Sequence, residues 1–282
     1  MLNEKNVTYF EARKWASFRI KDSADLDMYA VDFLLEKLFG LSPTELLINY
    51  QTKMSDAQWQ QFQAAIQQLL KGVPPQYIAG KADFYGLTIE VTPAVLIPRV
   101  ETEELVDWIL AENSPTHLTV LDIGTGSGAI AIALKKQRPD WAITASDISG
   151  AAIDIARQNA EANHTQISFV LSDIFDNIDD TYDIIVSNPP YIAKDEKADM
   201  DQSVINNEPD LALYAEDQGL AIYKRIAVGA SEHLNSSGKL FLEIGFHQEK
   251  PVTQIFQQAL PEAQVVPKHD VSGHQRMIQV KK

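Results

Sequence analysis

From residue 118 onward the chain alternates between apolar runs and amphipathic segments, and this alternation constrains the fold more than any other feature. Four runs that read as buried strands cover residues 118–123, 142–147, 167–173 and 182–188. Helical patterns separate the first three of them, over 128–137 and 150–162. Strands that are apolar on both faces and alternate with helices form a parallel sheet between two layers of helices. We therefore predict a doubly wound α/β domain.

The C-terminal part of the chain adds three further strands, and the last of these is expected to reverse direction. We place the strands at 239–245, 263–268 and 276–280, and two helices at 219–234 and 248–260. Only a few residues around Ser272 and Gly273 join the last two strands, which is too short for a parallel crossover. The sequence thus predicts a mostly parallel seven-stranded sheet with an antiparallel last strand.

The N-terminal part of the chain has a different pattern, with helical signals only. Two capping boxes, at 42–45 and 55–58, mark helix starts within residues 1–75. β-Branched and aromatic residues with turn glycines follow, and they indicate a short hairpin. We predict a small helical domain over 1–75, a linker with a hairpin over 76–100 and the α/β domain over 101–282.

The composition excludes several classes of protein. The net charge is −15, and residues 81–282 carry nearly all of it because residues 1–80 hold 8 Lys and Arg against 9 Asp and Glu. Nucleic-acid binding relies on clustered Lys and Arg, so this balance argues against a stable nucleic-acid partner. No apolar run approaches the ~20 residues that cross a bilayer. Cysteine is absent, which excludes disulfides and thiolate zinc sites. We expect a cytoplasmic protein without a membrane contact or a metal.

A glycine-rich turn follows the first strand of the α/β domain. It consists of Gly124, Thr125, Gly126, Ser127 and Gly128. Its glycines permit backbone conformations that other residues avoid, and a ligand there faces free N–H groups at a helix N-terminus. The turn also satisfies the dinucleotide fingerprint in its glycine-to-alanine form. A tight strand–helix turn without a ligand is the alternative.

Two acidic residues at strand ends narrow the choice of ligand. Asp147 ends the second strand, where a carboxylate accepts hydrogen bonds from ribose hydroxyls. Asp173 ends the third strand, where it could accept a donor such as an adenine amine. Each alone could be a helix cap, but together they favour an adenosine-containing ligand. Asp122, just before the glycines, could fix the loop or meet an ammonium group of the ligand.

The antiparallel last strand separates the two cofactor classes that the glycine loop allows. This topology resembles the class I S-adenosylmethionine-dependent methyltransferases, which have a Rossmann-like fold and bind the methionine moiety at the glycine loop. The resemblance implies S-adenosyl-L-methionine as the cofactor and leaves NAD as a minor alternative.

The fourth strand ends in an unusual corner, Asn188-Pro189-Pro190-Tyr191. The prolines have no N–H, so they stiffen the corner and leave carbonyl groups free to face a ligand. The Asn188 side chain and the Pro189 carbonyl suit the two N–H donors of a planar NH₂ group, and Tyr191 offers an aromatic surface. An amide nitrogen is a weak nucleophile, so transfer to it depends mainly on positioning and preorganised dipoles. A rigid surface turn is the alternative.

The corner resembles the signature of methyltransferases that act on planar amino groups in DNA, RNA or protein glutamine. With "PPQYIAGKADFYGLTIEVTPAVLIPRVETEELV", "DIGTGSGAIAIAL", "VSNPPYI", "NEPDLAL" and "LEIG", the chain resembles the HemK/PrmC family of peptide chain release factor glutamine N5-methyltransferases. The resemblance implies methylation of the glutamine in the Gly-Gly-Gln motif of bacterial class I release factors. Ribosomal-protein glutamine methyltransferases and DNA or RNA amino methyltransferases are the alternatives, as is a binding module without turnover.

The resemblance also implies roles for individual residues. The glycine loop and Asp147 would hold S-adenosylmethionine, and the backbone around Asp173-Ile174 would flank adenine. Asn188 would contact both cofactor and substrate, and the Asn-Pro-Pro-Tyr corner as a whole would grip the glutamine and form the catalytic site. Some relatives carry an aromatic residue where this chain has Ile174, which weakens stacking by that side chain. The resemblance further implies docking by the helical domain, and we expect a monomer.

The roles of a few flanking residues stay open at the level of sequence. Arg99, Glu101 and Glu103 could order a loop over the cofactor or cap the following helix. Glu208-Pro209 could close the other wall of the pocket or form a solvated turn.

Overall fold

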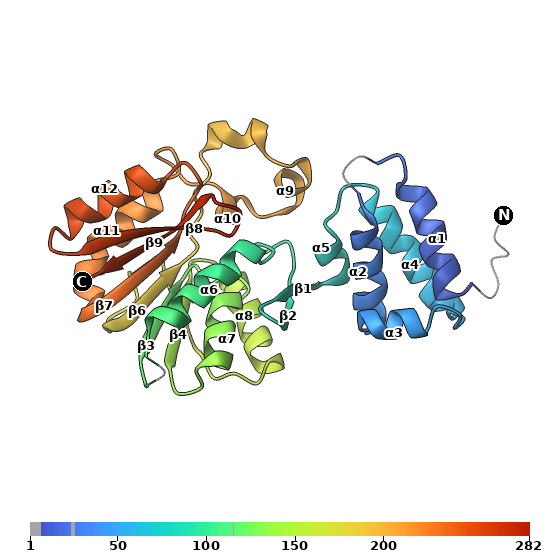
Figure 1. The fold of residues 1–282 in the computed structure, drawn as a ribbon, viewed down its shortest axis with the longest axis horizontal. Coiled ribbons are helices and arrows are strands. Elements are labelled where there is room, and N and C mark those ends of the chain that lie inside the picture. The colour runs from blue at the N-terminus through green and yellow to red at the C-terminus, as the bar shows by residue number, and fades with distance from the viewer. Residues whose placement is uncertain (1–6, 24–25, 115) are drawn as a thin grey trace. The chain divides into compact units, whose positions relative to one another are not determined.

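The computed structural model describes residues 7–23, 26–114 and 116–282; residues 1–6 and 24–25 of the predicted helical domain lie outside this description. The chain forms two compact units (Figure 1). The helical unit comprises the residues up to Lys81 together with Asp201–Asn207, and the sheet unit comprises Ala82–Met200 and Glu208–Lys282.

The helical unit is built from short helices that start at well-formed caps. Its helices are α1 (Tyr9–Ile20), α2 (Met28–Phe39), α3 (Pro43–Ile48), α4 (Asp56–Leu69), α5 (Pro75–Ala79) and α9 (Gln202–Asn207). Both predicted capping boxes form, with Ser42 and Ser55 as N-caps and the side chains of Glu45 and Gln58 reaching back. Such boxes satisfy backbone N–H groups that a helix start leaves free. The predicted helical character of this region is confirmed.

The sheet unit contains the predicted seven-stranded sheet. Its strands are β3 (Thr119–Ile123), β4 (Ala142–Asp147), β5 (Ser168–Leu171), β6 (Tyr182–Ser187), β7 (Leu234–Glu243), β8 (Gln264–His269) and β9 (Gln275–Lys281), in the order β5-β4-β3-β6-β7-β9-β8. β3 to β7 run parallel, and β9 pairs antiparallel with both β7 and β8. The predicted antiparallel last strand is confirmed, and it is inserted between its two predecessors.

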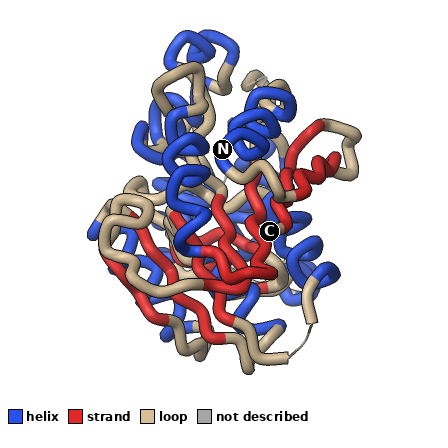
Figure 2. The backbone as a smooth tube through the Cα atoms, turned by 90° about the vertical axis from the view of Figure 1, so that its left-hand side faces the viewer, coloured by secondary structure: helices blue, strands red, loops and turns tan. Residues whose placement is uncertain are grey.

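Helices cover both faces of this sheet (Figure 2). They are α6 (Val100–Glu112), α7 (Ala129–Gln137), α8 (Gly150–Ala162), α11 (Ala221–His233) and α12 (Glu249–Ala259). Alternating residues of β7 separate the layers: Phe241 meets Trp108 of α6 edge-on, whereas Leu240 and Leu242 join the core cluster that includes α11 and α12. Neighbouring strand residues point to opposite faces, so each layer buries its own face of the sheet.

Two connecting segments differ in how closely they follow expectation. The predicted hairpin is present as β1 (Lys81–Phe84) paired with β2 (Leu87–Glu90). The segment 193–210, for which we predicted no helix or strand, contains the 3₁₀-helix η1 (Lys194–Asp199), α9 and the start of α10 (Asp210–Leu213). Such short helices carry little apolar periodicity, so a polar sequence concealed them. Within the described ranges no helix is both long and apolar enough to span a membrane.

Candidate active site

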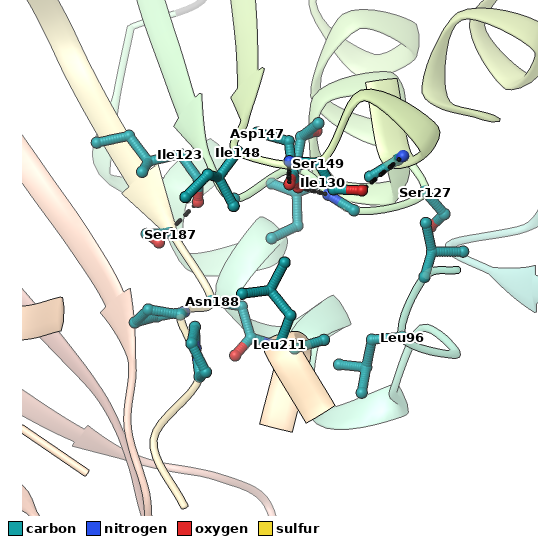
Figure 3. A pocket seen from close by; sticks show the side chains of 18 of the residues that line it. Leu96, Ile123, Ser127, Ile130, Asp147, Ile148, Ser149, Ser187, Asn188 and Leu211 are labelled. Carbon is teal, nitrogen blue, oxygen red and sulfur yellow. Dashed lines mark hydrogen bonds between the residues drawn. The ribbon is translucent and has the colours of Figure 1, made fainter. Parts of the chain in front are cut away.

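A cavity of about 550 Å³ lies at the carboxyl ends of the central parallel strands (Figure 3). Most of the residues predicted for the site line it: Gly124, Thr125, Gly126, Ser127, Asp147, Asp173, Ile174, Asn188, Pro189 and Pro190. Gly128 and Tyr191 are not among the lining residues. This volume falls within the range of small-molecule and cofactor sites.

The order of the strands explains why the glycine loop and the proline corner meet. The strand order reverses between β3 and β6, and ligands in open α/β sheets bind at such a switch point. Ile123 at the end of β3 pairs with Ser187 at the end of β6, and the Ser187 hydroxyl donates to the Ile123 carbonyl at 2.7 Å. Gly124 and Asn188 therefore leave the sheet side by side.

The glycine loop adopts the conformation that its sequence predicts. Gly124, Gly126 and Gly128 have φ angles of +71°, +56° and +82°. The Thr125 hydroxyl donates to Asp122 Oδ2 at 2.6 Å, and the N–H groups of Gly124 and Thr125 donate to the carbonyl of Ser146. Asp122 thus fixes the loop, one of the two roles left open for it. Asp122 is fully buried, and this burial raises its pKa to about 7 against the hydrogen bonds from the Thr125 hydroxyl and the backbone of Ala131.

Gly128 is required by packing as well as by conformation. A Cβ atom there would lie 3.1 Å from Ala156 Cβ and 3.2 Å from Ile132 Cδ1. We expect Gly128→Ala to lower the free energy of unfolding by about 1–2 kcal/mol through its left-handed φ alone, with crowding in addition. Gly150→Ala is the control, because it opens α8 without a positive φ and has no atom within 4 Å of the added Cβ. Equal melting temperatures for the two variants would contradict this account.

Asp147 is held beside the glycine loop by main-chain groups. Its Oδ2 accepts the N–H of Gly126 and its Oδ1 accepts the N–H of Ser149, each at 2.9 Å. Burial raises the pKa of Asp147, and hydrogen bonds from the N–H groups of Ser149, Gly126 and Ile148 oppose that shift. A carboxylate has about four acceptor sites, more than these N–H groups use. Asp147 therefore keeps capacity to accept hydroxyl donors from a ligand, as a ribose site requires.

Asp173 and Ile174 form a tight turn after β5 that lines the cavity. Ile174 has φ +57°, which is unusual for a β-branched residue, and its side chain is buried. The Ser172 hydroxyl donates to its carbonyl at 3.1 Å and stabilises the turn. Asp173 Oδ1 pairs with Arg225 of α11 at 2.9 Å. The ion pair, which the sequence did not reveal, leaves the backbone of the turn and the other Asp173 oxygen for a ligand.

The Asn-Pro-Pro-Tyr corner is anchored on its outer side. The Tyr191 carbonyl accepts the Gln248 amide at 2.8 Å, and Ile192 forms an isolated bridge to Tyr214. The Tyr191 side chain packs against the core cluster of α11 and α12, where burial and then the charge of Glu243 raise its pKa to about 12. The predicted aromatic surface is therefore directed mainly into the protein. Asn188, Pro189 and Pro190 face the cavity.

Arg99 and Pro209 line one wall of the cavity, and an ion pair between Arg99 and Glu208 supports this wall. The Glu208 side chain is 1% exposed, pairs with Arg99 through Oε1 and accepts the N–H of Ile97 at 3.3 Å through Oε2. This pair joins the loop before α6 to the loop before α10, so Glu208 does not lie in a solvated turn. Arg99 makes no side-chain cap bond, and Glu103 accepts the N–H of Tyr85 at 2.8 Å.

Removing one partner of this pair is expected to destabilise the sheet unit. Arg99→Ala leaves the buried Glu208 carboxylate without its charged partner, and an under-satisfied buried charged group costs about 1–3 kcal/mol. Urea unfolding followed by circular dichroism measures the loss. The free energy of unfolding should decrease less in Arg99→Lys, because lysine keeps the positive charge. Unchanged unfolding of Arg99→Ala would show that the pair does not hold the wall.

Several residues of the site escaped the sequence analysis. The apolar lining includes Phe84, Leu96, Ile130, Ile148 and Leu211. Thr102 also lines the cavity, and it bonds to the buried Glu243 at 2.6 Å. Glu243 ends β7, so the strand-end rule that identified Asp147 could have identified it as well. Among the described residues, no cluster of three or more His, Asp or Glu is arranged to hold a metal ion.

Comparisons with known proteins agree with this architecture. Two family models match the chain: the Methyltransferase small domain over residues 102–211 and the PrmC N-terminal domain over residues 11–80. A Thermus thermophilus 16S rRNA N2 G1207 methyltransferase, solved with AdoMet and guanosine, aligns with a TM-score of 0.52 and 17% identity. That alignment covers 72% of this chain and 49% of the other, and it shows a likeness in fold alone.

Two curated bacterial proteins resemble the chain along most of its length. Both are named release factor glutamine methyltransferase, and each is 49% identical to this chain. The Streptococcus pneumoniae protein aligns over 89% of this chain and 90% of its own length, and the Lactococcus lactis protein over 92% and 96%. Because this identity extends across the helical region and the sheet together, the chain belongs to the family of release factor glutamine methyltransferases.

Proposed function

We propose that this chain transfers a methyl group from S-adenosylmethionine to the side-chain amide nitrogen of the glutamine in the Gly-Gly-Gln motif of class I release factors. The observation that carries the proposal is the shared cavity: the glycine loop and the Asn188-Pro189 corner line it from neighbouring strands. The names of the most similar relatives support the same reaction and the same class of substrate.

The residues of the cavity fit the cofactor. Gly124 to Gly128 allow close approach of the ligand, and Asp147 accepts ribose hydroxyls. The turn at Asp173-Ile174 and the apolar side chain of Ile148 form a place for a flat base. The fold neighbour solved with AdoMet supports this choice. S-adenosylmethionine, when bound, supplies an electrophilic methyl group on a sulfonium.

The corner acts on the substrate by orientation. Asn188 Oδ1 and the Pro189 carbonyl are two acceptors for the two N–H bonds of a glutamine amide, and proline brings no N–H that would compete. Holding both N–H bonds fixes the direction of the nitrogen lone pair, which contributes through positioning. No base has to act first, since the extra proton on nitrogen can leave after transfer. A gripping role for Tyr191 remains a prediction.

The helical domain over residues 1–75 is proposed to dock the release factor, with the linker over 76–100 leading into the methyltransferase domain. We further propose that the enzyme acts as a monomer in the cytoplasm and holds no nucleic acid stably. Its acidic charge supports the last point, because phosphate backbones are bound by clustered Lys and Arg.

Mass spectrometry of a release factor after incubation with enzyme and S-adenosylmethionine tests the proposal. We expect one added methyl group on the glutamine of the Gly-Gly-Gln motif and none on a Gly-Gly-Glu variant. Ribosomal protein and DNA or RNA incubated in parallel should stay unmodified. Methylation of one of these, with none on the release factor, would assign the enzyme to an alternative class of amino-group methyltransferase.

A further inference from the structure

A chain of hydrogen bonds leads from the proline corner into the protein. Asn188 Nδ2 donates to Thr102 Oγ1 at 3.1 Å, and Thr102 Oγ1 donates to Glu243 Oε2 at 2.6 Å. Thr102 and Glu243 are only 4% and 2% exposed. The three residues come from separate elements, namely the end of β6, the first turn of α6 and the end of β7. The Asn188 side chain is thus linked to a buried hydroxyl at the cavity wall and, through it, to a buried carboxylate.

The chemistry of the donors and acceptors determines which way the Asn188 amide faces. An ionised carboxylate only accepts hydrogen bonds, so Thr102 must give its single hydroxyl hydrogen to Glu243. The Thr102 oxygen can then only accept from Asn188, and only the NH₂ end of that amide donates. The Oδ1 end is therefore left for the cavity. Asparagine oxygen and nitrogen are nearly equal in size, so shape alone does not select between the two orientations.

We propose that Thr102 and Glu243 are a positioning pair that selects the orientation of the Asn188 amide in which Oδ1 faces the substrate. The inference rests on the proposed function and refines its substrate class. With Oδ1 forward, the site accepts a group that donates two N–H bonds, such as a carboxamide. In the flipped orientation the NH₂ group of Asn188 would face the NH₂ group of the substrate, donor against donor.

The geometry also predicts that the orientation of the Asn188 amide, and with it turnover, depends on pH. When Glu243 is protonated its own hydroxyl can donate to Thr102, which frees the Thr102 hydrogen for Asn188 Oδ1 and favours the flipped amide. Burial raises the pKa of Glu243 to about 7, while the hydrogen bond from Thr102 and the charge of Arg276 on β9 oppose this shift. A weaker direct hydrogen bond from Asn188 opposes it too, and it also requires the NH₂ end of that amide to face Glu243. Glu101 on α6 raises the same pKa. Tyr191 and Tyr223 also face the carboxylate and are neutral over this range, because burial raises the pKa of each.

As the pH rises through about 7, activity and stability are expected to change in opposite directions. The folded chain holds a proton on Glu243 between its ordinary pKa of 4.5 and about 7, where the unfolded chain does not. The stability from this group is therefore complete below pH 4.5 and lost as the pH rises through about 7. Turnover should instead fall as the pH decreases through about 7.

Thr102→Val tests the proposal, with Thr102→Ser as the conservative rescue. Valine keeps the shape and removes the hydroxyl, so we expect kcat to fall about 10- to 100-fold with KM nearly unchanged. Serine keeps the hydroxyl and should stay within a few-fold of the wild type. Thr119→Val is a matched control, since the Thr119 hydroxyl also donates to a carboxylate, that of Asp183, at 2.9 Å. Thr119 begins β3, at the edge of the sheet away from the cavity. This substitution should reduce stability and leave kcat and the pH profile unchanged.

A readout that does not depend on activity is the side-chain NH₂ signal of Asn188 in protein labelled with ¹⁵N-asparagine, assigned by its loss in Asn188→Asp. We expect slow solvent exchange in the wild type and Thr102→Ser, and faster exchange in Thr102→Val. If Thr102→Val does not fold, Thr102→Val/Glu243→Met removes the unpaired carboxylate and should show the same two changes. Unchanged exchange and kcat in these variants would overturn the proposal. A wild type that shows the exchange pattern but does not methylate glutamine would instead count against the proposed function alone.

Discussion

Asn188→Ala is expected to lower kcat for glutamine methylation by about 10²- to 10³-fold while the protein stays folded. The variant removes Oδ1, one of the two acceptors that orient the substrate amide, and losses of this size follow removal of one preorganised polar group from other active sites. The Pro189 carbonyl alone cannot fix both N–H bonds. Initial rates at saturating peptide and cofactor measure the effect, and circular dichroism and the melting temperature check the fold.

Asn113→Ala is the matched control for this variant. Asn113 is the C-cap of α6, where its amide donates to the Ile109 carbonyl at 2.7 Å, and it does not line the cavity. It should keep the wild-type rate. If Asn188→Ala also kept the wild-type rate, the Asn-Pro-Pro-Tyr corner would have no role in the reaction, even though it lines the cavity.

Asp147→Ala is expected to weaken S-adenosylmethionine binding by about 10- to 100-fold. Hydrogen bonds to a charged group contribute about 1.5–3 kcal/mol, and the variant removes the acceptor for the ribose hydroxyls. It also frees the N–H groups of Gly126 and Ser149, which loosens the glycine loop. Isothermal titration calorimetry gives the dissociation constant, and kcat at saturating cofactor should change much less. The affinity of Asp147→Asn for the cofactor should lie between those of the wild type and Asp147→Ala, because asparagine keeps one acceptor oxygen.

Asp154→Ala provides the comparison for Asp147→Ala. Asp154 is a 70% exposed carboxylate on the nearby α8, paired with Arg157 at 3.5 Å. Such surface pairs contribute little, so its affinity for the cofactor should match that of the wild type. If Asp147→Ala binds the cofactor as tightly as Asp154→Ala does, the ribose role belongs to another residue.

Much of the fold could be predicted from sequence because the central strands are apolar on both faces. β3, β4 and β6 end at Ile123, Asp147 and Ser187, each within one residue of the predicted end. The polar residues that follow such strands lie at one sheet edge by geometry alone. This is why the sequence alone predicts that the glycine loop, Asp147 and Asn188 lie in one crevice.

Other features depend on contacts between residues distant in the sequence. Thr102 and Glu243 are 141 residues apart. Each lies in a separate segment of the family resemblance, "VETE" and "LEIG", and no local pattern links the two. Only the packing of α6 against β7 brings them together. The ion pair of Arg99 with Glu208 is of the same kind. For Tyr191, the sequence showed an aromatic residue after the prolines but not the direction of its side chain, which depends on the core beneath α11 and α12.

The central claim is that the corner after β6 presents Asn188 Oδ1 and the Pro189 carbonyl to the amide of a glutamine. A crystal structure with S-adenosylhomocysteine and a Gly-Gly-Gln peptide measures this most directly. We predict that the glutamine nitrogen lies within hydrogen-bond distance of both oxygens and faces the sulfur of the cofactor product. A glutamine side chain bound away from the corner, or an Asn188 amide with its NH₂ end toward the peptide, would contradict the account.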